Sequence, residues 1–209
     1  MDPPKDDSLL VWMGTAPCAD GVLAGVLARY DEPHRRYHDG RHVRLVVARC
    51  VALFDEVMVA HRSAVVWAAL WHDAVYDPHS KTNERDSAEL ADADLASLGV
   101  SAADRSEVSR LIMLTAGHVV GADDFNGAVL VDADLAVLGA SSADYAAYVD
   151  AVRAEYSFVD NDAWRIGRAK VLRALLDSPQ LFQTRPMASR EVNARRNLEA
   201  ELRELTNEA

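Results

Sequence analysis

The amino-acid sequence predicts an all-α protein, folded as a single bundle of about eight or nine helices. Three observations lead to this fold class. Apolar residues recur at the three- and four-residue spacing of a helix face along nearly the whole chain, helix-capping residues stand between the apolar segments, and no segment alternates apolar and polar residues as a strand does. Because no repeat or low-complexity linker divides the chain, we expect one domain over 16–209, preceded by a flexible segment over 1–15.

The apolar spacing gives each helix approximate bounds. The predicted helical segments are 43–57, 63–77, 83–98, 101–118, 126–138, 142–155, 160–176 and a charged segment from about 189 onward. Segment 63–77 is apolar almost all round, which is typical of a central, buried helix. Gly99 and Gly139 follow two of the segments at the position where glycine commonly ends a helix.

Composition limits the class of protein. The chain has 209 residues, 50% of them hydrophobic, which is enough for a substantial core. Its formal net charge of −11 disfavours a nucleic-acid polymer as partner, because such a surface repels phosphate backbones. The N-terminus does not resemble a signal peptide, and no apolar run is long enough to span a bilayer. Two isolated cysteines make no disulfide framework, and Cys50 is expected in the core, so we expect a cytoplasmic protein without a membrane partner.

The dipeptide His72-Asp73 is the most informative pair of residues, because it lies within the most apolar predicted helix. Burying a carboxylate there costs several kcal/mol unless the carboxylate is paired or coordinated. One interpretation is a hydrogen-bonded His-Asp pair without further function. His42 favours a second interpretation, since it shares a helix face with Val46 and Leu53. Two core-facing histidines and an aspartate on neighbouring helices are typical of a metal site.

A fourth ligand is expected on the helix predicted over 126–138. Asp132 and Asp134 stand about 200° apart on a helix, so their side chains face opposite ways. Asp134 lies in the centre of an apolar stripe and is the predicted ligand, while Asp132 is kept as a candidate outer partner of the metal. Two imidazoles and two carboxylates suit one divalent Mn, Fe, Co, Ni or Zn ion better than Ca or Mg.

The order His…His-Asp…Asp on helices resembles the HD-domain superfamily of metal-dependent phosphohydrolases. Further likeness to a bacterial branch of predicted HD phosphohydrolases extends from Arg29 to the C-terminus, over 29–38, 71–77, 83–88, 132–135, 153–156, 167–168 and 194–198. The resemblance implies an HD-type helical domain and the metal ligands His42, His72, Asp73 and Asp134. Many members have a glutamate three residues after the HD aspartate, where this chain has Tyr76.

Other residues are candidates for roles around the metal. The catalytic candidates are Glu84, which could orient or deprotonate the attacking water, then Asp77, four residues after Asp73, and Asp73 itself. The alternative for Glu84 is a carboxylate without a catalytic role, in the first turn of a helix, where the helix dipole favours negative charge. A second metal could use His118, but it is not expected. Substrate phosphate is expected to contact a histidine and several arginines, each arginine having a surface salt bridge as its alternative: His38, Arg35, Arg153, Arg168 and Arg195.

The leading functional hypothesis is a metal-dependent hydrolase of phosphate esters, such as nucleotides, that uses a metal-activated water. The expected partner is therefore a small phosphorylated substrate, and a homodimer stays open. Two alternatives are a non-catalytic nucleotide or phosphate sensor that retains the HD metal site, and an HD-fold di-iron oxygenase, which would need further histidine ligands.

Overall fold

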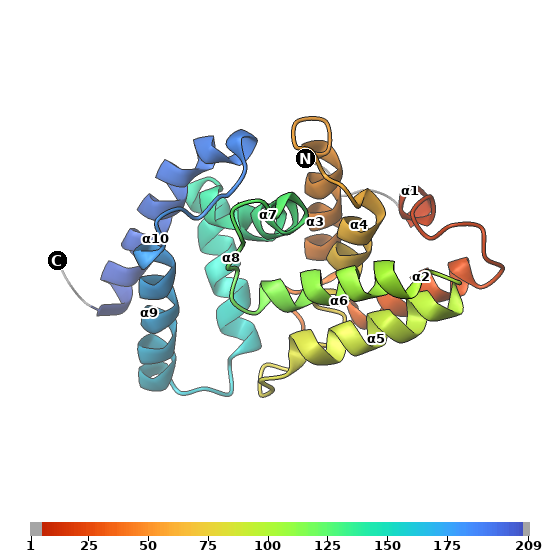
Figure 1. Ribbon diagram of the computed structural model, residues 1–209. Helices are drawn as coiled ribbons and strands as arrows, with labels where there is room; N and C mark the ends of the chain where they lie inside the picture. Colours follow the sequence, from red (N-terminus) through yellow and green to blue (C-terminus); the bar gives the residue numbers. More distant parts are fainter. Residues whose placement is uncertain (1–5, 207–209) are drawn as a thin grey trace.

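The computed structural model describes residues 6–206, which form ten α-helices and two short 3₁₀ helices and contain no strand (Figure 1). The elements are α1 (Asp6–Leu10), α2 (Ala19–Arg29), α3 (Gly40–Leu53), α4 (Arg62–Trp71), α5 (Asn83–Ser97), α6 (Ala102–Thr115), α7 (Phe125–Asp134), η1 (Leu135–Gly139), α8 (Ser142–Glu155), α9 (Asn161–Asp177), η2 (Arg185–Arg190) and α10 (Glu191–Thr206). The all-α fold class is confirmed, with ten α-helices where the sequence predicts eight or nine.

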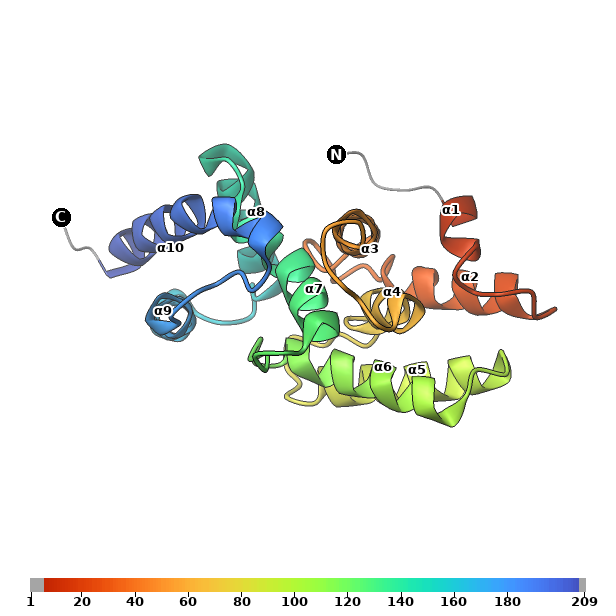
Figure 2. The ribbon, with the colours of Figure 1, turned by 45° about the horizontal axis from the view of Figure 1, so that its top comes forward.

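Helices α3, α4 and α7 lie at the centre of the molecule (Figure 2). The antiparallel pair α5 and α6 covers one side of them, and α8, η1, α9 and α10 pack together on another side (Figure 1). A single cluster of buried apolar side chains extends from Leu9 and Leu23 near the N-terminus to Leu172 and Leu198 in the last two α-helices. The N-terminal helices and the C-terminal helices therefore share one hydrophobic core.

The N-terminal segment includes a short helix. Within the segment 1–15, which is predicted to be flexible, residues 6–10 form α1, and the side chains of Leu9 and Met13 are buried. The indole of Trp67 also donates a hydrogen bond to the carbonyl of Trp12, at 2.7 Å. Residues 1–5 lie outside the described residues. Burial of these two apolar side chains connects the described part of this segment to the core.

Helix α4 ends at Trp71, six residues before the predicted end at 77. The HD dipeptide therefore lies at the C-terminal end of the helix rather than in its middle. Tertiary hydrogen bonds explain the difference, because the Arg35 guanidinium binds the carbonyls of Asp73 and Ala74, and the Ser87 hydroxyl bonds both the N–H and the carbonyl of Val75. These bonds satisfy backbone groups that would otherwise continue the helix.

Two further helix ends also differ from the sequence prediction. Helix α7 ends at Asp134 and continues as the 3₁₀ helix η1, so the predicted α-helix over 126–138 is too long. Gly139 is the last residue of η1. A Cβ at this position would lie 2.7 Å from the Cβ of Arg190, so glycine permits the close packing of the two segments. Gly99 follows α5 with a positive φ of 77°, as a glycine stop does.

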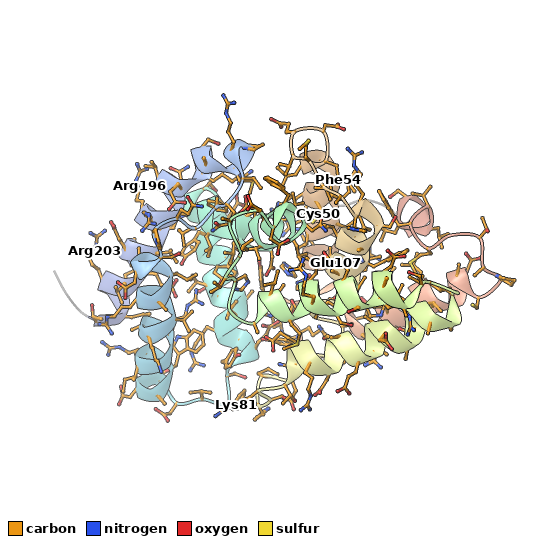
Figure 3. All side chains as sticks on the ribbon, in the orientation of Figure 1. Cys50, Phe54, Lys81, Glu107, Arg196 and Arg203 are labelled. Carbon is orange, nitrogen blue, oxygen red and sulfur yellow. The ribbon has the colours of Figure 1, made fainter. Side chains whose placement is uncertain are left out.

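The C-terminal helix begins at Glu191, after η2, rather than near 189. Its outward side carries charged residues, of which Arg196 and Arg203 are labelled in Figure 3, while Ala194 and Leu198 are buried. Cys50 is fully buried, which confirms its predicted place in the core. Within residues 6–206, none of the helices combines the length and the apolar character needed to cross a bilayer.

Candidate metal centre

Three helix ends bring the predicted metal ligands together. The Asp39 carboxylate caps α3 by accepting hydrogen bonds from the N–H groups of Arg41 and His42, which places His42 in the first turn. His72 follows the last residue of α4, and Asp134 is the last residue of α7. Both histidines are buried, and Asp73 and Asp134 are partly buried.

The donor atoms of these side chains face one another. His42 Nε2 lies 3.3 Å from His72 Nε2 and 3.3 Å from Asp134 Oδ1. Asp73 Oδ2 lies 3.0 Å from His72 Nε2 and 3.6 Å from His42 Nε2. One ligand atom from each of His42, His72 and Asp134 fits within a mutual distance of 4.8 Å. Donor atoms of His42, His72 and Asp134 thus form one group, and Asp73 adjoins it through the two histidines.

The cluster fits a divalent metal ion. Metal–ligand bonds of about 2.1 Å in tetrahedral or octahedral geometry place neighbouring donor atoms about 3.0–3.4 Å apart. The observed separations run from 3.0 to 3.6 Å. His72 Nδ1 donates to the carbonyl of Ala69 at 3.0 Å, so Nε2 remains free as the ligand atom. Two facing imidazole nitrogens beside two carboxylates need a positive charge between them, which either a metal ion or protons can supply.

Electrostatics within the cluster favour cations. Burial lowers the pKa of His42, but hydrogen bonds with Asp134 and Asp73 outweigh burial and raise it. Burial likewise opposes the charged form of His72, and the charge of Asp73 raises its pKa well above the ordinary value. Burial raises the pKa of Asp73 and Asp134, but the histidines beside them hold both pKa values well below the ordinary range. The two carboxylates therefore favour a positive charge beside the imidazoles, whether a proton or a metal ion supplies it.

Metal binding is therefore expected to stabilise the fold in a pH-dependent manner. At a free metal concentration 100 times the Kd, the linkage contributes about 2.7 kcal/mol, or about 5–10 °C in Tm for a domain of this size. The raised pKa values of His42 and His72 mean that protons compete with the metal, so the gain should be larger at pH 8 than at pH 6. Thermal scans with manganese and with chelator measure this, and identical curves would contradict a site built from buried ligands.

Arg35, predicted to bind substrate, holds the loop that carries Asp73 instead. Its side chain is buried and donates to the carbonyls of His38, Asp73 and Ala74, at 3.0, 2.7 and 3.1 Å. The guanidinium also pairs with Glu32 and lies over the Tyr30 ring at 5.0 Å. Because these partners use the donors of the guanidinium, the role of Arg35 is to fix the ligand Asp73 beside His38.

His38 stands next to the cluster and is oriented by a buried carboxylate. Its Nδ1 lies 2.7 Å from Glu155 Oε2, and its ring centroid is 5.7 Å from that of His42. Glu155 Oε2 also accepts the Tyr76 hydroxyl at 2.9 Å, and the Tyr76 ring stacks on His38 at 4.3 Å. Among the described residues, His38 Nε2 has no hydrogen-bond partner. The Nδ1 side of the His38 ring is thus fixed by Glu155, and the Nε2 side is open to a ligand.

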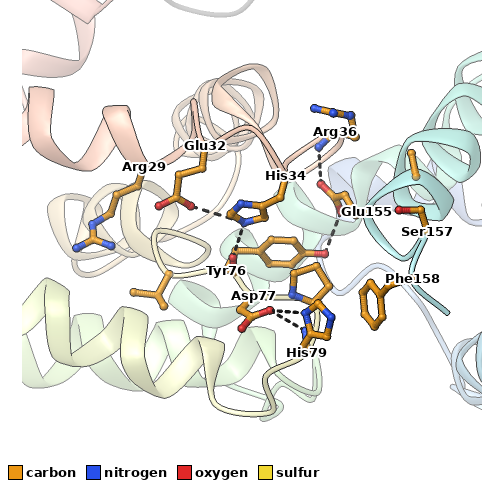
Figure 4. Close-up of a pocket in the computed structure, with 13 residues that line it drawn as sticks. Arg29, Glu32, His34, Arg36, Tyr76, Asp77, His79, Glu155, Ser157 and Phe158 are labelled. Carbon is orange, nitrogen blue, oxygen red and sulfur yellow. Dashed lines mark hydrogen bonds and ion pairs between the residues drawn. The ribbon is translucent and has the colours of Figure 1, made fainter.

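Glu155 Oε1 is saturated by backbone donors. The N–H groups of Arg36, Tyr37 and His38 all donate to it, at 2.8, 2.8 and 3.0 Å, and Figure 4 shows the Arg36 and Tyr76 contacts. Burial raises the pKa of Glu155, but the hydrogen bond with His38 and these donors lower it to about 2. The carboxylate therefore stays ionised and fixes the segment 36–38 that leads into α3.

Glu155→Gln is expected to destabilise the fold by about 3 kcal/mol at pH 7, because the folded pKa of about 2 lies below the ordinary value of 4.5. A depressed pKa contributes stability above pH 4.5, and this contribution is lost as pH falls towards 2. The gap between wild type and variant should therefore shrink below pH 4.5. Urea unfolding at pH 7 and pH 3.5 measures it, with the exposed Glu199→Gln as control. A gap of constant size at both pH values would refute the assignment.

Asp132 and Asp134 face opposite ways, as their spacing predicts, but Asp132 is not an outer partner of the metal. Its fully buried carboxylate accepts the backbone N–H groups of Gln183 and Thr184, at 2.6 and 2.7 Å. Burial raises the pKa of Asp132. Its role is to anchor the segment between α9 and η2 to α7.

His118 reaches the cluster through Asp134. Its Nε2 lies 3.0 Å from Asp134 Oδ2, on the oxygen that does not face His42 and His72. His118 also has a φ of 53°, the only positive value of a non-glycine residue within residues 6–206. A left-handed backbone is a strained state for such a residue, and it is commonly retained where the side chain has a function. His118 thus adds a third imidazole to the edge of the centre.

The remaining predicted residues lie outside these contacts. Asp77 is exposed. Its carboxylate bonds His79, and its backbone N–H donates to the side chain of Asn83. Glu84 lies in the first turn of α5, and its side chain makes no hydrogen bond or ion pair within residues 6–206. Of the three catalytic candidates, only Asp73 therefore lies in the cluster.

Three further arginines predicted to bind substrate have structural partners instead. Arg153 donates to the carbonyls of Tyr156 and Val159 and lies over the Trp164 ring. Arg168 is buried and paired with Glu201 at 2.7 Å. Arg195 pairs with Glu191 and donates to the carbonyls that end α9. These guanidinium groups stabilise helix ends and helix contacts, which local sequence cannot distinguish from anion binding.

Glu155 and Tyr76 contact His38, and the sequence analysis did not name either as a site residue. The available signal was that Tyr148, Val152 and Glu155 share one face of α8, so a charged residue continues an inward-facing stripe. Tyr76 stands where many HD proteins have a glutamate, and here its hydroxyl contacts a glutamate from another helix.

Comparison of the chain with protein-family models finds no match. Searches among curated proteins and among solved structures find no significant match either. The description of the centre therefore rests on the residues and their geometry.

Proposed function

We propose that this chain is a metal-dependent hydrolase of phosphate esters. The observation that carries the proposal is the close grouping of His42, His72 and Asp134, with Asp73 beside the two histidines and His38 next to them. His42, His72, Asp73 and Asp134 would hold a metal ion, which would lower the pKa of water towards neutrality and neutralise charge on a phosphoryl group.

His38 is the group that manages the proton on the leaving side. Glu155 holds Nδ1 and leaves Nε2 without a partner among the described residues, which suits transfer of a proton to the leaving-group oxygen. In the overall reaction, water adds to phosphorus, the bond between phosphorus and the ester oxygen breaks, and the alcohol and inorganic phosphate leave. Arg35 binds the carbonyls of both His38 and Asp73 and so fixes the two residues relative to each other.

The charge distribution also supports a small phosphorylated substrate. All four predicted anion-binding arginines have protein partners, so attraction of a phosphoryl group falls to the metal and to the imidazoles of His38 and His118. With a formal net charge of −11, the rest of the molecule offers little attraction to a polyanion.

A phosphatase screen tests this proposal. The purified protein is assayed against nucleotide, sugar-phosphate and alkyl-phosphate panels with each of Mn, Fe, Co, Ni, Zn and Mg, and His72→Ala serves as the inactive control. We expect release of inorganic phosphate with at least one metal and none from the variant. Ligand binding without turnover would favour the sensor hypothesis over the hydrolase hypothesis. Equal activity of wild type and variant would show that the activity does not depend on the proposed metal centre.

A further inference from the structure

A cavity of about 730 Å³ adjoins the candidate metal centre. It reaches the centre through His118, which bonds Asp134, and through Leu135, the residue after Asp134. Its other walls are the loop 116–120, one face of α9 and the segment 178–183. The cavity therefore begins one side chain away from the metal ligands.

The lining of this cavity is largely apolar. Val171, Ala174 and Leu175 recur at helical spacing on the face of α9, and Val119 and Val120 come from the loop. Among the described residues that line it there is no lysine or arginine, and Asp177 is the charged carboxyl group present. Such a lining favours uncharged organic groups and repels a second phosphate.

The walls are fixed before any ligand binds. Asp132 holds the N–H groups of Gln183 and Thr184, and Glu191 holds those of Leu181 and Phe182. Two buried or partly buried carboxylates thus anchor the segment that faces α9. A preformed apolar wall binds a ligand without the entropic cost of ordering it.

A second cavity, of about 520 Å³, has a different character (Figure 4). Charged side chains line it, including Arg29, Glu32, Arg36 and Asp77, and none of the four predicted metal ligands does. Its contact with the centre is indirect, through Tyr76 and Glu155. It is therefore a poorer match for a group attached to a phosphoryl group at the metal.

We propose that the cavity between α9 and the loop 116–120 binds the organic part of a phosphate monoester, and that this part is uncharged and largely apolar. The inference rests on the proposed function, since it places the phosphoryl group at the metal centre. It excludes nucleoside diphosphates, triphosphates and other substrates with a second phosphate as the preferred class.

Binding of alkylphosphonates to the manganese-loaded protein tests the inference without turnover. Calorimetry compares methyl-, butyl- and hexylphosphonate, and 3,4-dihydroxybutylphosphonate serves as a polar ligand of matched length. Full burial of a methylene strengthens binding about three- to four-fold, so butylphosphonate should bind at least about tenfold more tightly than methylphosphonate. The dihydroxy ligand should lose most of that gain.

Two exposed positions on α9 provide variants that should fold. Val171→Glu and Ala174→Asp add a carboxylate to the cavity wall, and both positions are exposed. The matched control is Ile166→Glu, on the same helix, 74% exposed and outside the lining. We expect the two wall variants to remove the gain from chain length and to keep methylphosphonate binding, while the control behaves as wild type.

The outcomes separate the two proposals. If chain length gives no gain, or the gain survives in both wall variants, the assignment of the cavity is overturned, even when phosphate esters are hydrolysed. If the gain appears and vanishes as expected but no ester is hydrolysed with any metal, the cavity assignment stands and the hydrolase proposal fails.

Discussion

Replacing Asp134 with alanine is expected to abolish stoichiometric binding of a divalent metal ion and, with it, the proposed hydrolysis. Asp134 Oδ1 lies 3.3 Å from His42 Nε2 and 3.6 Å from His72 Nε2, so the variant loses a donor and leaves two imidazoles facing each other. The loss of metal affinity should exceed the about 10- to 100-fold loss typical of outer partners. Elemental analysis after dialysis measures it, and full occupancy in the variant would remove Asp134 from the ligand set.

Asp132→Ala is the matched control for this experiment, because it removes a carboxylate two residues away on the same helix. The variant should retain metal but unfold more easily, by about 2–4 kcal/mol, since the N–H groups of Gln183 and Thr184 lose their acceptor. Urea unfolding and metal content therefore give opposite patterns for the two aspartates. Loss of metal from the Asp132 variant alone would reverse the assignment of their faces.

His38→Gln is expected to lower kcat by about 10²–10⁴-fold while leaving metal content unchanged. Glutamine can hydrogen-bond but cannot deliver a proton to the leaving group. The loss should therefore be large for an alkyl phosphate and small for p-nitrophenyl phosphate, whose leaving group needs little protonation. Steady-state kinetics on both esters measures the difference. An equal loss on both would mean that His38 acts in binding or structure rather than in proton transfer.

Glu84→Gln and Asp77→Asn test the catalytic candidates of the sequence analysis in the same assay. Neither side chain contacts the cluster, and the Asp77 carboxylate is bonded to His79, so both variants should lose far less kcat than His38→Gln. If Glu84→Gln loses activity and His38→Gln retains it, proton transfer belongs to Glu84 and our proposal for His38 is wrong.

Local periodicity explains why much of the fold could be predicted. A helix face repeats every three to four residues, so the apolar spacing of 43–57 indicates a helix from nearby residues alone. The caps at Ser101 and Asp160 likewise bond N–H groups two or three residues later. The same argument placed His42 on an inward face and separated Asp134 from Asp132. Three apolar helices then had to pack together, which is why their polar residues meet.

The roles of the charged side chains could not be predicted in this way. Arg35 and Arg168 were candidates for phosphate binding, but their partners are carbonyls and carboxylates up to 39 residues away in the sequence. The end of α4 at Trp71 depends on the same long-range bonds. Glu155 is separated from His38 by 117 residues, so no local pattern connects them.

The sequence by itself thus determined the all-α class and the order of the helices, because helix formation and amphipathic burial depend on residues a few positions apart. It also placed His42 and Asp134 on inward faces, but not the buried Glu155. Only the tertiary structure decided which of them share a site, which carboxylate orients His38, and which arginines are already paired. The reason is physical: a hydrogen bond or ion pair depends on distances of about 3 Å between atoms, and packing alone brings distant residues that close.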